Sequence, residues 1–274
     1  MLFTVLVGML LSTRGALPWR ALVFGSLGIG LVAGAAAAVN HLVDRRIDAV
    51  MARTRGRPLP RGTVRAGQVI VFATGLGLGG MVFLLVFTNP LCAALTFASL
   101  VGYAVVYSLF LKRSTPQNIV IGGAAGAAPP LLGWVAVTGQ LDPGALLLFL
   151  IILVWTPPHF WALAIHRRDD YARAEVPMLP VTHGVAFTSA RILHYTVALV
   201  LITALPFAIG MSGLPYLAGA MLLGGRFVML AWRLRRDVRL AMPVFRYSIA
   251  YLFGLFALLL ADHALAGQEW SPAM

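Results

Sequence analysis

The sequence predicts an all-α, polytopic membrane protein, and three observations lead to this fold class. Hydrophobic residues make up 60% of the 274 residues and charged residues only 11%, whereas soluble domains carry about 25% charged residues. The apolar residues fall into runs of about 20, the length that crosses a bilayer as a helix. Glycine is frequent, with 28 copies, as it is where membrane helices pack closely. A soluble enzyme of ordinary type is therefore disfavoured.

Eight apolar runs are predicted to span the membrane. They cover roughly residues 20–40, 67–88, 91–111, 117–137, 144–165, 188–209, 213–231 and 245–262, each close to the required length. An earlier apolar stretch, Leu2 to Leu11, is too short to cross alone. We expect it to be the end of a longer first helix or a tilted or interfacial segment, and no basic segment precedes it to indicate a cleaved signal peptide. Counting this stretch gives nine helices.

We expect residues 1–274 to form a single membrane domain with a weak internal repeat. Asp48 and Asp170 are 122 positions apart, and so are Arg113 and Arg235. Each half of the chain thus carries an acidic connection followed, two helices later, by a basic one. Because parallel repeats of helical blocks are common in membrane proteins, this spacing predicts two four-helix halves and a last helix.

The basic residues indicate the orientation of the chain. The net charge is +12, and 19 of the 21 Lys and Arg residues lie on one predicted side, within 41–66, 112–113, 167–191 and 226–246. Cytoplasmic connections carry the excess of positive charge, so we expect this side and the N-terminus in the cytoplasm, with only Arg14 and Arg20 on the opposite face. Because these charges alternate with apolar runs, membrane orientation accounts for them, and no nucleic-acid partner is expected. The one cysteine, Cys92, excludes an internal disulfide.

The first acidic cluster continues the second predicted helix. Asn40, Asp44 and Asp48 are spaced at i, i+4 and i+8, which places their oxygens on one helix face. Two like charges on one face repel each other, and Mg²⁺ is a natural counter-charge because it takes carboxylate oxygens and bridges to phosphates. In the alternative interpretation the two carboxylates pair with basic neighbours on a solvated helix end. Those neighbours are Arg45, Arg46 and Arg53.

The second acidic cluster lies at residues 166–175 and follows the fifth long run. It contains Asp169, Asp170 and Glu175 among arginines, and Pro177 and Pro180 end any helix after it. Two acidic clusters on one membrane face, each surrounded by basic side chains, suggest carboxylates that hold Mg²⁺ while cations neutralise a diphosphate. Neither a Walker A motif nor a kinase loop is present, so an aqueous kinase is poorly supported.

The Asn40-x-x-x-Asp44-x-x-x-Asp48 pattern resembles the UbiA superfamily of intramembrane prenyltransferases. Further segments resemble the haem-farnesylating branch of that superfamily, at residues 51–59, 107–113, 118–130, 155–161 and 170–180. The similarity is strong over about residues 20–190 and rests on hydropathy alone in the C-terminal third. The second cluster departs from the wider superfamily, because Ala174 stands where a second Asp is usual, with Glu175 beside it. This departure favours the haem branch over the 4-hydroxybenzoate branch.

The resemblance implies a nine-helix UbiA-type bundle around a central cavity that opens laterally to lipid. It also implies a reaction in which farnesyl diphosphate ionises and the allylic cation attacks a vinyl group of haem B. Water then quenches the product cation, giving haem O and diphosphate. The implied setting is the plasma (inner) membrane of a bacterium, with the acidic connections cytoplasmic and a haem A synthase or terminal-oxidase assembly partner downstream.

The resemblance implies a role for each of ten side chains, with Mg²⁺ as cofactor. The implied catalytic residues are Asn40, Asp44, Asp48 and Asp170, the last three being the metal ligands. The implied diphosphate-binding residues are Arg53, Arg57, Lys112 and Arg113. The residues implied to contact haem or the cation are His159 and Trp161.

For three polar side chains a purely structural role stays open as the alternative. His159 is as readily explained by a helix-packing hydrogen bond after the Pro-Pro pair. A solvated loop histidine explains His166 better than a haem propionate ligand does. Asp169 is simply explained by pairing with Arg167 or Arg173.

Two other functions compete with haem farnesylation. The nearest is a UbiA-type prenyltransferase acting on another aromatic acceptor, which His159 and the segment 177–180 disfavour. The other is a membrane transporter or lipid-binding protein. Transporter sites typically lie near the bilayer midplane, whereas the acidic residues here are predicted at the membrane faces, which disfavours that class.

Overall fold

The computed structural model describes residues 1–13 and 16–268, so Arg14 lies outside the described residues. Throughout this described part the regular elements are helices and no strand occurs. Eight of the described helices are long and apolar enough to cross a membrane. With the shorter apolar helix α1 (Leu2–Leu11) they make nine, so the predicted all-α class is confirmed.

The long helices follow the predicted apolar runs closely. They are η1 with α2 (Ala21–Gly25 and Ser26–Val50), α3 (Ala66–Phe87), α4 with η2 (Pro90–Val101 and Gly102–Leu111), α6 (Asn118–Thr138), α7 (Pro143–His166), α10 (Gly184–Ile202), α12 (Leu214–Leu234) and α13 (Ala241–Gln268), which follows η3 (Val238–Leu240). The run predicted at 188–209 is divided, because α10 ends at Ile202 and α11 (Leu205–Ala208) begins anew. Pro206 lies in the first turn of α11, where its missing N–H costs no intrahelical hydrogen bond. The connections carry α5 (Lys112–Ser114), α8 (Arg168–Arg173) and α9 (Leu179–Thr182).

Helix α1 is packed inside the bundle although it is short. Val5 and Val7 have no exposed surface, so one face of α1 is covered by neighbouring helices. A Cβ atom on Gly8 would collide with the backbone of Pro130, and one on Gly133 with the backbone of Val5. The absence of side chains at these two glycines lets α1 and α6 approach closely, as small residues do in membrane helix pairs.

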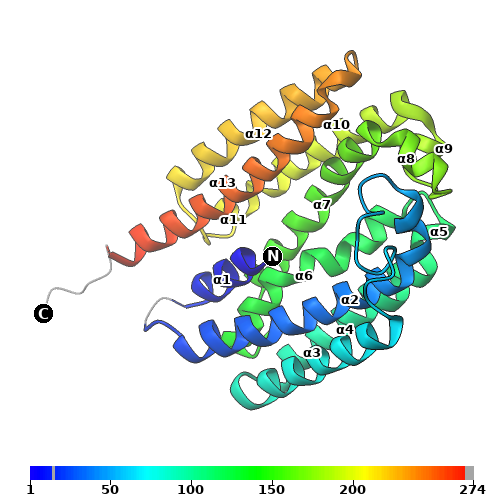
Figure 1. Cartoon of the computed structure of the whole chain (residues 1–274). Helices are drawn as coiled ribbons and strands as arrows, with labels where there is room; N and C mark the ends of the chain where they lie inside the picture. The colour runs from blue at the N-terminus through cyan, green and yellow to red at the C-terminus, as the bar shows by residue number, and fades with distance from the viewer. Residues whose placement is uncertain (14–15, 269–274) are drawn as a thin grey trace, which may run out of the picture.

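The helices form two neighbouring sets (Figure 1). Helices α2, α3, α4 with η2, and α6 pack together, while α7 packs with α10 and α13, and α12 joins α10 and α13. Helix α6 contacts α7, and α1 lies against both α6 and α13, so these contacts connect the sets. The internal repeat of four-helix halves stays a prediction.

The connections that carry the acidic and basic residues gather at one end of the bundle. Figure 1 shows the loop after α2 (residues 51–65) beside α5, α8 and α9 at the right of the view. Helix α8 ends at Arg173. Two residues later Glu175 has a left-handed φ of 53°, and the chain then reverses toward α9. This reversal brings residues 176–178 back toward the end of α2.

Candidate active site

A cavity of about 180 Å³ lies at this end of the bundle, between α2, the loop 51–65, η2 and the segment after α8. Its polar lining consists of an amide, carboxylates, cations and phenols. Its apolar lining comes from the end of α2, the segment after α8, and one residue each of α6 and α7. The lining residues are Asn40, Asp44, Ile47, Asp48, Met51, Arg53, Arg57, Tyr103, Tyr107, Lys112, Ile119, Phe160, Tyr171, Val176 and Met178.

The three predicted residues of α2 line this cavity together. Asn40, Asp44 and Asp48 are all buried, with Asp44 only 2% exposed. They share a face because α2 stays helical from Ser26 to Val50, so residues four apart lie one above the other. Below them α2 is rich in alanine and glycine, whereas Met51 is extended and ends the helix. The predicted polar stripe is therefore confirmed as geometry.

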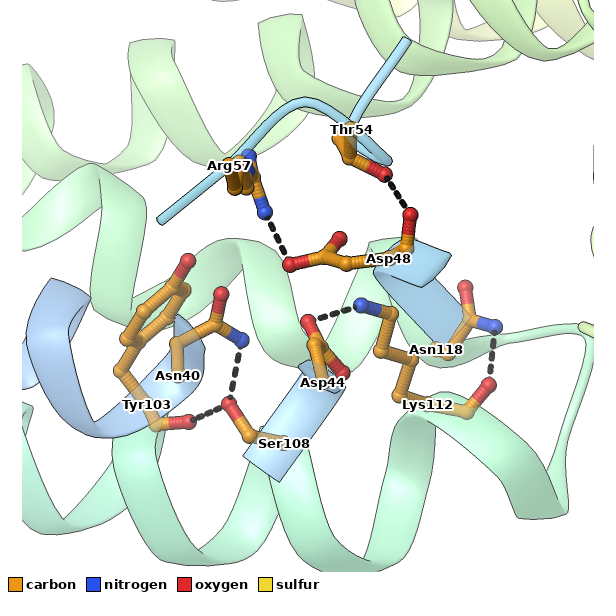
Figure 2. A network of polar contacts seen from close by, with 9 residues as sticks. All are labelled: Asn40, Asp44, Asp48, Thr54, Arg57, Tyr103, Ser108, Lys112 and Asn118. Atoms are coloured by element: carbon orange, nitrogen blue, oxygen red, sulfur yellow. Dashed lines mark hydrogen bonds and ion pairs between the residues drawn. The ribbon is translucent and has the colours of Figure 1, made fainter. Parts of the chain in front are cut away.

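Each aspartate of the stripe is paired with a cation from another segment. Lys112 Nζ donates to Asp44 Oδ2, and Arg57 Nη1 donates to Asp48 Oδ2 at 2.6 Å. Thr54 Oγ1 donates to the carbonyl oxygen of Asp48 at 3.2 Å, which ties the loop to the end of α2. Figure 2 shows these contacts converging on α2. The alternative partners considered from sequence, Arg45, Arg46 and Arg53, form neither of these ion pairs.

The π-helix η2 explains why Lys112 reaches this site. Tyr103, Tyr107 and Lys112 all line the cavity, although nine residues separate the first from the last. In an α-helix nine residues make about two and a half turns, which would put Lys112 opposite Tyr103. A π-helix bonds i to i+5 and winds more slowly, so spacings of four and five return to one face. The rings of Tyr103 and Tyr107 accordingly stack, with centroids 5.6 Å apart.

Two buried oxygens beside Lys112 lack a hydrogen-bond donor among the described residues. They are Asp44 Oδ1 and Asn118 Oδ1. The amide of Asn118 donates from Nδ2 to the carbonyl oxygen of Lys112 at 3.2 Å and so holds the end of η2. Burying an acceptor without a partner costs about 1–3 kcal/mol. An oxygen in this state fits a cation or a donor supplied by a ligand.

The second acidic cluster is differently arranged. Asp170 is buried and pairs with Arg173 and, at 3.6 Å, with Arg167, whereas Asp169 is exposed. Asp170 is not among the residues that line the cavity; its neighbour Tyr171 is. Across residues 1–13 and 16–268 no three His, Cys, Asp or Glu side chains gather closely enough to hold a metal ion. The structure thus brings Asp44 and Asp48 together with Asn40, and keeps Asp170 on its own arginines.

Tyr171 contributes a neutral phenol to the cavity. Burial raises the pKa of Tyr171, and the nearby charges of Arg53 and Arg167 offset that rise only in part. The side chain therefore stays protonated at neutral pH and can donate a hydrogen bond to a ligand in the cavity. Arg53 lines the same cavity, while the side chain of Arg113 lies outside the described residues.

His159 and Trp161 lie away from the acidic cavity. His159 Nδ1 is 2.7 Å from Ser248 Oγ, and its ring stacks between Trp155 and Phe245. This is the helix-packing arrangement considered from sequence, here between α7 and α13. Trp161 packs edge-on against Tyr195 of α10. Their contact with haem or with a cation stays a prediction.

A second, apolar cavity of about 220 Å³ shares the lining residue Tyr103 with the first. Its other lining residues are mostly aliphatic and come from α2, α4 and α6, deeper in the bundle. They include Ile29, Val32, Ala36, Leu100, Pro129 and Leu132. The charged cavity and the apolar cavity together fit a ligand with an anionic head and a hydrocarbon tail.

Sequence reasoning assigned no role to several residues of this site. Tyr107, Ser108, Asn118 and Tyr171 belong to segments that carry the family resemblance, and that membership was the available indication. Nothing in the sequence indicated a role for Tyr103, because a helical periodicity of 3.6 residues places it away from Lys112. Only the π-helix brings the two onto one face.

The fold and the site together define the class of protein: a polytopic integral membrane protein with a charged cavity and a deeper apolar cavity. The UbiA prenyltransferase family model matches residues 1–262, and the chain belongs to that family. A protoheme IX farnesyltransferase of Azotobacter vinelandii is 64% identical over 267 residues, covering 97% of this chain and 89% of the relative. Protoheme IX farnesyltransferase 1 of Pseudomonas fluorescens is 62% identical with the same coverage.

Solved structures show the same fold at low sequence identity. One, from work on digeranylgeranylglyceryl phosphate synthase, is 18% identical with a TM-score of 0.81, covering 96% of this chain and 92% of the other. A UbiA homologue of Archaeoglobus fulgidus bound to DMAPP and Mg²⁺ is 14% identical with a TM-score of 0.64, and 94% of each chain is covered. At these identities the likeness concerns the fold alone.

Proposed function

We propose that the protein transfers the farnesyl group of farnesyl diphosphate to a vinyl group of haem B, with addition of water, and so forms haem O and diphosphate. The observation that carries the proposal is the 64% identity, over 97% of the chain, with a protein named for this activity. The juxtaposition of a charged and an apolar cavity supports it, because the proposed donor has one part suited to each.

The α2 stripe fits Mg²⁺, which takes oxygen ligands and bridges to phosphates. Asp44, Asp48 and Asn40 line one cavity, and Asp44 Oδ1 lacks a hydrogen-bond partner among the described residues. Mg²⁺ bound here would supply positive charge to the diphosphate leaving group. Asp170 stays a proposed ligand. To bind the metal, its carboxylate would have to leave its ion pairs with Arg167 and Arg173.

The cations of the cavity are proposed to take up the diphosphate. Arg57 and Lys112 now neutralise Asp48 and Asp44, so when the diphosphate enters they can turn from carboxylate to phosphate oxygens without travelling far. Arg53 lines the cavity and forms no ion pair with a carboxylate in the described part of the chain. Charge-assisted hydrogen bonds from these groups stabilise the negative charge that develops as the C–O bond breaks. Arg113 is proposed as a further member.

The apolar chamber is proposed to hold the farnesyl chain and exclude water from the cation. Tyr103 lines both cavities, and with Tyr107 and Phe160 it offers aromatic faces that attract a cation. Haem B is the proposed acceptor, with His159 and Trp161 proposed to contact haem or the cation from α7. The positive-inside pattern supports a bacterial inner membrane with the charged cavity cytoplasmic, and the product would pass to a haem A synthase or a terminal-oxidase assembly partner.

A product assay tests this function. Purified protein in lipid receives haem B, farnesyl diphosphate and Mg²⁺, and the haem fraction is analysed by mass spectrometry. We expect a new haem heavier by one farnesyl group and one hydroxyl group, absent when EDTA is present. Consumption of farnesyl diphosphate with haem unchanged would replace haem by another aromatic acceptor. No consumption by the folded protein would contradict the prenyltransferase proposal.

A further inference from the structure

Ser108 connects the two helices that form the acidic cavity. Its side chain has no exposed surface. Its Oγ lies 2.8 Å from the carbonyl oxygen of Tyr103 on the same π-helix and 2.9 Å from Nδ2 of Asn40 on α2. Figure 2 shows both contacts, with the amide oxygen of Asn40 pointing away from Ser108.

The hydrogen-bonding capacity of these groups fixes which way the Asn40 amide faces. A hydroxyl has one proton and two lone pairs, whereas a carbonyl oxygen only accepts. Ser108 therefore gives its proton to the Tyr103 carbonyl and can only accept from Asn40. In the opposite amide orientation Asn40 Oδ1 would face the hydroxyl, which could donate to it only by giving up the Tyr103 carbonyl. The arrangement in the structure keeps both hydrogen bonds, with Asn40 donating through Nδ2 and Oδ1 turned elsewhere.

The winding of η2 makes this arrangement possible. Serine hydroxyls in α-helices bond to carbonyls three or four residues earlier, whereas Ser108 bonds to the carbonyl five residues earlier. That spacing is the i to i+5 repeat of a π-helix. It places the hydroxyl on the face that also carries Tyr103 and Lys112, opposite the polar stripe of α2.

We propose that Ser108 is a positioning residue that orients Asn40 so that Oδ1 faces the cavity and serves as an oxygen ligand beside Asp44 and Asp48. This inference rests on the proposed function, because it assigns an orientation to one ligand of the same metal-diphosphate site. Residues that orient metal ligands typically change metal affinity about 10–100-fold when they are removed. Ser108 never touches the metal or the diphosphate itself.

Metal binding to the full-length protein in lipid tests the proposal directly. The probe is Mn²⁺ with farnesyl thiodiphosphate, an unreactive analogue, and free Mn²⁺ is measured by electron paramagnetic resonance. We expect Ser108→Ala to raise the Mn²⁺ concentration for half-saturation about tenfold, and Ser108→Thr, which keeps the hydroxyl, to stay near wild type. The matched control is Ser189→Ala, since Ser189 is also a buried serine bonded to a backbone carbonyl but lies on α10, away from the cavity. It should bind Mn²⁺ like wild type.

A double-variant cycle shows whether Ser108 acts through Asn40. In an Asn40→Ala background, Ser108→Ala should cause no further loss of Mn²⁺ affinity, and this comparison decides the matter if the threonine variant does not fold. Equal affinity for Ser108→Ala and wild type would overturn the proposal, as would an undiminished effect without Asn40. If the wild-type protein bound no Mn²⁺ in the presence of the analogue, that result would contradict the proposed metal-diphosphate site itself, and with it the role of Ser108.

Discussion

Arg57 shows how a single side chain can serve two partners. It is part-buried and lies 2.6 Å from Asp48, so it neutralises a carboxylate in the protein alone and remains within reach of an incoming diphosphate. Its neighbour Arg55 is exposed and does not line the cavity. The structure thus distinguishes the positions of two arginines that stand two residues apart. The sequence could not distinguish them, because both belong to the same basic segment.

We expect Arg57→Ala to raise the KM for farnesyl diphosphate about 10-fold to 100-fold, the effect of losing a hydrogen bond to a charged group worth about 1.5–3 kcal/mol. Initial rates over a range of farnesyl diphosphate concentrations measure the change. Arg55→Ala is the matched control and should keep the wild-type KM. Equal KM values for both variants would remove Arg57 from the diphosphate site.

The acidic residues illustrate what sequence could predict about the site and what it could not. The stripe of Asn40, Asp44 and Asp48 was predictable because helical spacing alone places the three on one face. Their cations were not, since Lys112 reaches Asp44 across 68 positions of sequence. In the second cluster Asp170, not Asp169, took the arginine pairing, because Asp170 is the one that turns inward and becomes buried.

At the scale of elements, hydropathy predicted the spans well and their winding not at all. The apolar runs set helix positions because bilayer thickness fixes the length required. The same composition is compatible with either α or π winding, so η2 could not be foreseen from it. What the structure adds is a contact that supports this winding, since a Cβ on Gly122 of α6 would collide with the ring of Tyr107.

Gly122→Ala should therefore destabilise the protein by about 1–3 kcal/mol, the usual cost of overpacking, and lower activity by displacing Tyr107. Thermal unfolding in detergent and the turnover rate measure the two effects. Gly79→Ala on α3 is the control, because no other side chain or backbone lies within 4 Å of the added atom. A Gly122→Ala variant with wild-type stability and rate would show that η2 tolerates displacement.

At the scale of the whole molecule, the charged connections lie together at one end of the helices (Figure 1). The nine-helix bundle itself was implied by family resemblance, because hydropathy counts helices without arranging them. Burial of α1 against α6 depends on Gly8 and Gly133. Nothing in the sequence distinguished these two glycines from the others.

Orientation in the membrane follows from the distribution of basic residues and can be measured by cysteine labelling. In a Cys92→Ala background we expect Gly56→Cys, in the connection after α2, to react with an impermeant maleimide only after the cells are opened. Gln140→Cys, in the connection between α6 and α7, should react in cells with a permeable outer membrane and an intact inner one. The reverse pattern would invert the topology and place the charged cavity outside the cytoplasm.

The central claim is that the charged cavity activates farnesyl diphosphate through the carboxylates of α2 and a divalent metal. Release of inorganic diphosphate from farnesyl diphosphate, in the presence of haem B and Mg²⁺, tests it most directly. We predict that Asp44→Asn, like EDTA, lowers the rate about 100-fold or more, while Asp169→Asn, a change at an exposed acidic residue, leaves it unchanged. Wild-type release by Asp44→Asn, or by the native protein after metal removal, would contradict the account.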